Sequence, residues 1–103
     1  MVFISSQAKI DLDNIVTGLL EWEKIVLTVD EVMRYVDDIV DICYRLDTVG
    51  YRHKATHEEH SKHGTYVYSY KRNQKTTWYI VYNIDFSGSV LVNKIISNYL
   101  TVS

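Results

Sequence analysis

Hydrophobic and polar positions follow two different periods along the chain, which divide it into a helical half and a strand-forming half. Residues 76–85 read TTWYIVYNID, a run of β-branched and aromatic residues between two turn-rich segments, and this composition predicts a central strand. Residues 65–72 and 90–97 predict strands on either side of it, connected by turns at 73–75 and 86–89. Gly88 suits the positive φ of the second turn. We therefore expect an antiparallel meander of three strands.

The first half of the chain predicts a short strand at residues 2–4 and two amphipathic helices. Ser5 or Ser6 can cap the first helix, whose apolar positions recur at helical spacing from residue 8 to residue 19. Residues 22–27 either end that helix or bridge to the next. Thr28 and Glu31 have capping-box spacing and predict the start of a second helix, and Gly50 predicts its stop. The apolar stripe of this second helix comprises Val29, Val32, Met33, Val36, Ile39, Val40, Cys43 and Leu46.

The two faces of the central strand differ in polarity. Trp78, Ile80, Tyr82 and Ile84 share the more apolar face, which is expected to meet the helices, so the face of Tyr79 is predicted to be the open working surface. Residues 51–64 show no periodicity and predict a polar loop. The sequence thus predicts an α+β fold of order βααβββ, with the helices on one face of the sheet, in a single domain spanning residues 1–103.

Composition bears on where in the cell the protein is expected. Hydrophobic residues make up 47% of the chain and charged residues 23%, no apolar run is long enough for a membrane span, and the N-terminus lacks the basic flank of a signal peptide, so we expect a cytoplasmic protein with no membrane association. Cys43 has no partner for an internal disulfide and is expected in the core.

The two halves of the chain differ in charge. Residues 1–50 hold ten acidic and four basic side chains, and residues 51–103 hold three acidic and seven basic side chains. This uneven charge indicates either an anion-binding surface on the sheet side or a solvated surface whose charge is unevenly distributed.

The four histidines, His53, His57, His60 and His63, all lie in the polar loop and permit three interpretations. A metal site is one, but no cysteine lies nearby and the spacing matches neither HExxH nor a zinc finger, so we predict no metal and no small-molecule cofactor. A solvated loop is the second interpretation. The third is a general acid or base beside a bound phosphate, because the imidazole pKa lies near neutrality.

Tyrosines alternate along residues 66–70, and cations follow them at Lys71, Arg72 and Lys75. Aromatic side chains beside cations are typical of proteins that bind single-stranded nucleic acid. The alternative is that the tyrosines form the core face of their strand. Under the first interpretation Lys71, Arg72 and Lys75 are candidate RNA contacts, and Tyr79 on the expected open face is a fourth.

Three segments carry a resemblance to a known family. VFISSQAKIDLDNI at residues 2–15 is similar to an opening strand followed by A-x-x-D-L-x-x-I, TWYIVYNID at 77–85 is similar to a Y-R-[IL]-x-Y strand, and IISNYL closes the pattern at 95–100. The chain resembles the RelE/ParE superfamily of small bacterial toxins. Its ribonuclease members cut mRNA on the ribosome by acid–base chemistry, with cations at the scissile phosphate and a late tyrosine, whereas its gyrase-directed members lack that residue set.

The resemblance implies specific site residues. Tyr99 matches the late tyrosine, and Lys71 or Arg72 matches the cations that end the second strand of the family. Tyr79 stands where RNA-cleaving members have arginine. No family motif places a histidine at the entry to the tyrosine strand, so His63 or His60 is a candidate proton carrier on chemical grounds alone.

The function implied is the toxin of a type II toxin–antitoxin system, held by a cognate antitoxin protein and acting as a ribosome-dependent mRNA endonuclease. The alternative is a non-catalytic interaction protein of the same fold, gyrase-directed or antitoxin-binding only. A small metal-binding domain, resting on the histidine loop alone, is the third possibility.

Overall fold

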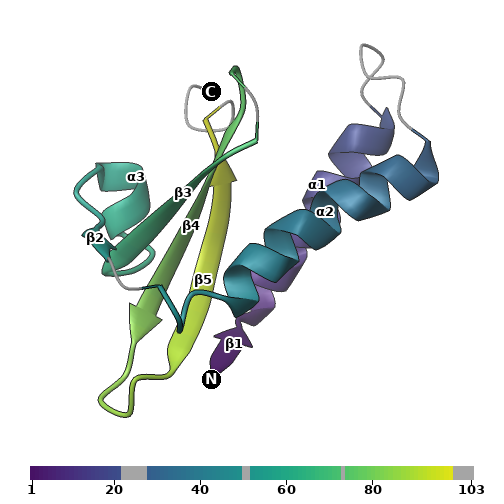
Figure 1. Ribbon diagram of the computed structural model, residues 1–103. Coiled ribbons are helices and arrows are strands. Elements are labelled where there is room, and N and C mark those ends of the chain that lie inside the picture. The colour runs from purple at the N-terminus through teal and green to yellow at the C-terminus, as the bar shows by residue number, and fades with distance from the viewer. Residues whose placement is uncertain (22–27, 50–51, 73, 99–103) are drawn as a thin grey trace.

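The computed structural model describes residues 1–21, 28–49, 52–72 and 74–98, and shows an α+β fold with helices and a five-stranded mixed sheet (Figure 1). The sheet has the order β1-β5-β4-β3-β2, in which β1 runs parallel to β5 and the other neighbours are antiparallel. The elements are β1 (Val2–Ile4), α1 (Ser6–Glu21), α2 (Val29–Tyr44), β2 (His53–Lys54), α3 (Glu58–Ser61), β3 (Tyr66–Lys71), β4 (Thr77–Ile84) and β5 (Val90–Ser97).

The α+β class and the central position of β4 confirm the prediction, but the element order does not. The segment predicted as a structureless loop contains β2 and α3, so the order is βααβαβββ instead of βααβββ. Strand β2 forms because the chain after α2 turns back along β3, where the Ala55 amide donates to the Thr65 carbonyl oxygen at 2.8 Å. Two strand residues are too few to produce a visible period in the sequence.

The starts of both long helices follow the sequence signals. Ser5, not Ser6, caps α1, since its hydroxyl accepts from the Ala8 amide at 3.1 Å. The Thr28 hydroxyl accepts from the Glu31 amide and donates to the Glu31 carboxylate, each at 3.1 Å, which confirms the predicted start of α2. The ambiguous residues 22–27 lie outside the described residues.

The predicted end of α2 is wrong. The helix stops at Tyr44, and Arg45 closes it by donating its amide to the Ile42 carbonyl oxygen at 3.1 Å. The Thr48 amide and hydroxyl both bind the Arg45 carbonyl oxygen, at 3.0 and 2.8 Å, so a local turn replaces the next helical bond. Leu46 is still buried in the core although it lies beyond the helix. Gly50, the predicted stop, is outside the described residues.

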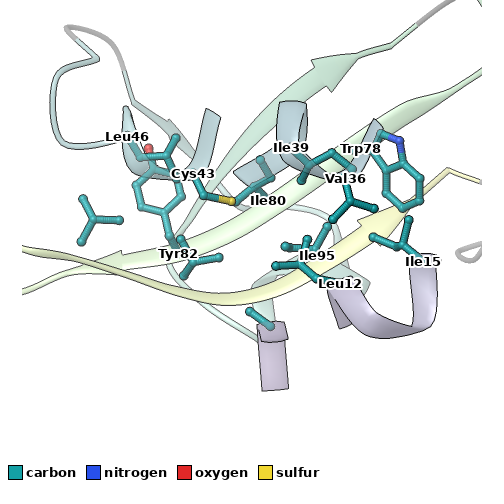
Figure 2. Packing of buried hydrophobic residues seen from close by; sticks show 13 residues of the cluster. Leu12, Ile15, Val36, Ile39, Cys43, Leu46, Trp78, Ile80, Tyr82 and Ile95 are labelled. Carbon is teal, nitrogen blue, oxygen red and sulfur yellow. The ribbon is translucent and has the colours of Figure 1, made fainter. Parts of the chain in front are cut away.

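The core lies between the two long helices and one face of the sheet (Figure 2). Trp78, Ile80 and Tyr82 of β4 are buried there, which confirms the face that the sequence assigned to the helices. Helix α2 contributes Val32, Val36, Ile39 and Cys43, which are all buried. Burial raises the pKa of the Cys43 thiol to about 12, so this cysteine is the inert core residue that was expected.

Two positions of the apolar run that the sequence predicts for the second helix are not in the core. Val29 is 62% exposed and Met33 45% exposed. Each helical residue turns by about 100°, so Met33 points well away from the direction of buried Val32. The stripe that touches the sheet is therefore narrower than the run of apolar residues in α2.

Both hairpin turns lie where the sequence predicts them. Gly88 adopts φ of 87°, and the Asp85 carboxylate accepts from the amides of Ser87 and Ser89 at 2.9 and 3.0 Å. The Ser87 hydroxyl, which donates to the same carboxylate at 2.6 Å, and then these amide bonds lower the pKa of Asp85. The first hairpin closes with the Arg72 amide donating to Thr76, and Asn73 is outside the described residues. Among the described helices, none is both long and apolar enough to cross a membrane.

Candidate functional site

The sheet face opposite α1 and α2 is partly covered by α3, and Figure 1 shows this short helix beside β3 and β4 on the side away from the long helices. The His60 ring packs on Tyr79 with centroids 4.5 Å apart, and the His57 ring lies 5.0 Å from His60. Val81, on the same face, is fully buried. The prediction that this face is open is wrong where α3 lies on it.

Gly64 allows the chain after α3 to approach the sheet closely. A Cβ atom there would lie 2.9 Å from Val81 Cγ1 and 3.1 Å from the Tyr82 carbonyl oxygen. The Thr65 amide then donates to the Asn83 side chain at 2.8 Å. This glycine is thus required for close approach, and it places the end of the α3 segment directly on β4 and β5.

Helix α3 is only four residues long and depends on a cap and on packing. His57 caps it with Nδ1, which accepts from the Glu59 amide at 3.2 Å. Glu59 pairs with Lys62 at 2.9 Å, which lowers the pKa of this exposed carboxyl. Isolated helices of this length are not stable in water, so the His60 contact with Tyr79 is what holds α3 in place.

His60 is buried without a partner for one of its ring nitrogens. His60 is 7% exposed, and its Nε2 has no hydrogen-bond partner in the described part of the chain. Burial, followed by the nearby charge of His57, lowers the pKa of His60. The imidazole is therefore neutral near pH 7, but Nε2 is closed to solvent and reaches a substrate only if α3 moves.

His63 lies close to a charged pair contributed by α1 and β5. Lys94 Nζ binds Asp11 Oδ1 at 2.9 Å, and the second oxygen of Asp11 accepts from the Ile95 amide at 3.0 Å. Burial and then the Lys94 charge lower the pKa of half-buried His63, while Asp11 opposes the shift. We call His63, Lys94 and Asp11 the α3–β5 cluster. It combines a neutral imidazole with a positioned ammonium group.

The sequence interpretation missed Lys94 and Asp11, although one signal pointed to Asp11. The motif A-x-x-D-L-x-x-I corresponds to Ala8, Asp11, Leu12 and Ile15, and these four residues are all buried. A carboxylate enclosed by apolar residues needs hydrogen-bond partners. Asp11 finds one in the Ile95 amide, at the edge of β5 beyond the end of β1. The motif thus describes a packing interaction.

Lys71 and Arg72 do not come together at one site. Arg72 turns to the helix side, where its guanidinium binds the Asp38 carboxylate, donates to the Tyr70 hydroxyl at 3.1 Å and lies 4.2 Å above the Tyr35 ring. Partial burial disfavours the charged form of Arg72, but the bonds to Asp38 and Tyr70 outweigh it and raise its pKa. Lys71 is exposed and pairs with Thr77 across the hairpin.

The remaining predicted site residues lie in three settings. Lys75 is exposed in the first hairpin, Tyr79 is half-buried under His60, and Tyr99 is outside the described residues. Asn98 stands just before Tyr99 and closes the β4–β5 pair, since its side chain accepts from the Thr77 amide at 3.0 Å and donates to the Lys75 carbonyl at 2.9 Å.

The alternating tyrosines of β3 pack against the core. Tyr66, Tyr68 and Tyr70 are half-buried there, and Tyr66 stacks on Tyr82 with ring centroids 5.7 Å apart. They form the inner face of β3, as the alternative interpretation held, and are not a free stacking platform.

The described residues contain no group of three or more histidine, cysteine or acidic side chains that could hold a metal ion. Comparisons with models of protein families, with curated proteins and with solved structures found no match.

Proposed function

We propose that the protein is a toxin of the RelE/ParE type that binds RNA on the sheet face carrying α3 and cleaves it slowly, with His63 as the proton carrier. The observation that supports this most directly is the α3–β5 cluster. Asp11 holds Lys94 Nζ at 2.9 Å, and burial, followed by the charge of Lys94, lowers the pKa of His63, so a cation for phosphate and a base for a hydroxyl would occur together.

The chemistry requires no metal. Neutral His63 takes the proton of a ribose 2′-hydroxyl, the new bond forms between that oxygen and phosphorus, and the bond to the 5′-oxygen breaks. Lys94 offsets the charge that develops on the phosphate oxygens. The departing 5′-oxygen needs a proton from an acid, and we assign that role to Tyr99, which matches the late tyrosine of the family.

Exposed cations on the same side of the protein support the binding step. Lys71 lies on the strand face of Tyr79, and Lys75 lies in the adjoining hairpin. Salt-dependent binding of the phosphate backbone would follow from such contacts. Arg72 is not among them, because it is bound to Asp38 on the helix side.

The test measures binding and cleavage separately. Binding of a labelled single-stranded RNA is followed by fluorescence anisotropy at several salt concentrations, and cleavage of a translated mRNA is followed in a cell-free extract. His63→Gln should lower the cleavage rate by about 10² or more while RNA binding is kept. His53→Gln, which changes an exposed histidine of β2, is the matched control and should leave the rate unchanged.

The variant Lys71→Ala/Lys75→Ala should weaken RNA binding and reduce its salt dependence. If the wild-type protein neither binds RNA in a salt-dependent manner nor cleaves mRNA, this function is wrong. If His63→Gln cleaves as fast as the wild type, the assignment of His63 is wrong.

A non-catalytic interaction protein of the same fold is the second candidate, and two observations favour it. His60 Nε2 is sealed under α3, and the Arg72 charge is bound to Asp38. In this case expression arrests growth to the same degree in the wild type, in Tyr99→Phe and in Lys71→Ala/Arg72→Ala, and no mRNA is cleaved.

A further inference from the structure

Three exposed apolar side chains and one half-buried one share one side of α2. Val29, Met33 and Tyr44 are 62%, 45% and 55% exposed, and Val40 between them is half-buried. At 100° per residue these four positions fall within about 60° of the helix circumference. We call them the α2 stripe. It lies beside the buried face of the helix and reaches from its first residue to its last.

A row of carboxylates borders the α2 stripe. Asp30, Asp37 and Asp41 are exposed and occupy the next 40° or so of the circumference. The ion pairs found in the described ranges use Asp11, Asp38, Asp47 and Glu59, so none involves this acidic row. Arg34 is the one basic residue between Val29 and Tyr44. The acidic row therefore makes no ion pair within the described ranges and adjoins an apolar surface, with Arg34 and Arg45 at its border, where Arg45 Nε donates to the Asp41 carbonyl oxygen at 3.3 Å.

Helix α1 extends both features. Leu20 and Ile10 are 48% and 51% exposed, and Asp13 and Glu21 are exposed as well. Figure 1 shows the two helices side by side, with the ends that carry Glu21 and Val29 farthest from the sheet. The outer side of α2 thus combines apolar side chains with carboxylates, and α1 exposes side chains of both kinds, while the basic half of the chain lies in the sheet layer.

We propose that this outer side of the α1–α2 hairpin binds an amphipathic helix of a partner protein that carries lysine or arginine beside its apolar residues. The stripe spans four helical turns, about 22 Å, which matches a helix laid along α2. Apolar residues of the partner would cover Val29 and Met33, and its cations would face Asp30, Asp37 and Asp41. The proposal does not depend on the RNA-directed function of the opposite layer.

Charge argues against a second copy of this chain as the occupant. A two-fold symmetric contact places the same surface of both copies together, so the acidic rows would meet each other. Like charges brought together at an interface are unfavourable. A cationic partner removes that repulsion.

The test uses the full chain and a labelled 18-residue helical peptide in which leucine forms one face and lysine the flanks. We expect this peptide to bind, and binding to weaken as salt rises. Asp30→Asn/Asp37→Asn/Asp41→Asn should weaken binding by about tenfold or more, and Met33→Ser should weaken it several-fold. Phe86→Ser is the control, because Phe86 is a fully exposed apolar residue of the β4–β5 turn. It should bind like the wild type.

Two further peptides make the result decisive. A version with glutamate for lysine should not bind, and a scrambled version that breaks the apolar face should bind at least tenfold more weakly. Equal binding of the scrambled peptide, or unchanged binding by the triple asparagine variant, would overturn the proposal. So would a dimer in sedimentation experiments that Met33→Ser converts to monomer, since a second copy would then cover the stripe. Thermal melts of each variant, and photo-crosslinking of the peptide to α2, separate lost binding from lost folding.

Discussion

Replacing Asp11 with alanine should destabilise the protein far more than its place on a helix suggests. Asp11 is 7% exposed and accepts from Lys94 Nζ at 2.9 Å, from the Ile95 backbone amide at 3.0 Å and from the Gln7 side-chain Nε2 at 3.0 Å. The bond to a charged partner is worth about 1.5 to 3 kcal/mol, and a buried amide left without a partner costs about 1 to 3 kcal/mol. Lys94 adds little to this cost, because its side chain is 24% exposed and can turn to water.

Alanine returns part of this loss, since it is the better helix former by roughly 0.5 kcal/mol. The low ends of the two ranges, less this gain, leave an expected net loss of about 2 to 3 kcal/mol of unfolding free energy. For a domain of this size that corresponds to a fall in Tm of roughly 10 to 20 °C.

Thermal unfolding followed by circular dichroism measures this loss. The matched control is Asp13→Ala, which removes an exposed carboxylate two residues further along α1 and gains the same helix propensity. A cycle with Lys94→Met then isolates the coupling between Lys94 and Asp11. If Asp11→Ala melts within about 2 °C of Asp13→Ala, the bonds from α1 to β5 contribute no net stability and the reasoning fails.

Three further predictions concern the core and α3. Val36→Asp should abolish the cooperative melt, because an unpaired carboxylate in the core costs several kcal/mol, and an unchanged Tm would place Val36 outside the core. Because the folded-state pKa of His60 is lowered, unfolding free energy should fall as pH drops below about 6.5. His60→Phe should flatten this decline in urea titrations at pH 5 to 8, leaving the smaller slope due to His63, and an equal slope in both proteins would contradict it. Cys43 should react with a thiol reagent at pH 8 only after unfolding, and prompt labelling of the native protein would refute its burial.

The strands were predictable because each repeats the two-residue period several times. The expected strand at 90–97 matches β5, and those at 65–72 and 76–85 exceed β3 and β4 by one residue at each end. The start of α2 was predictable for a local reason, since Thr28 and Glu31 bind each other three residues apart. Features determined by neighbours in the sequence are therefore visible in it.

The features that the sequence did not show depend on contacts between distant segments. Helix α3 has four residues, too few for a helical period, and is held by His60 packing on Tyr79, nineteen residues further along the chain. Asp11 alternates with lysine and aspartate like any exposed residue, and only the free edge of β5 explains its burial. Met33 shows the opposite error, because an apolar residue in a helical pattern can still point away from the buried direction of Val32.

Strand alternation limits what a family resemblance can transfer to this chain. Lys71 and Arg72 were equivalent candidates for the cation that ends the second family strand, yet neighbouring residues of a strand point to opposite faces. Lys71 therefore lies on the side of α3 and Tyr79, whereas Arg72 lies on the helix side, bound to Asp38 and stacked on Tyr35. A phosphate held beside Tyr79 is reached by Lys71 and not by Arg72. Arg72→Ala should accordingly lower the Tm without changing the salt dependence of RNA binding. Lys71→Ala should reduce the salt dependence of RNA binding without changing the Tm.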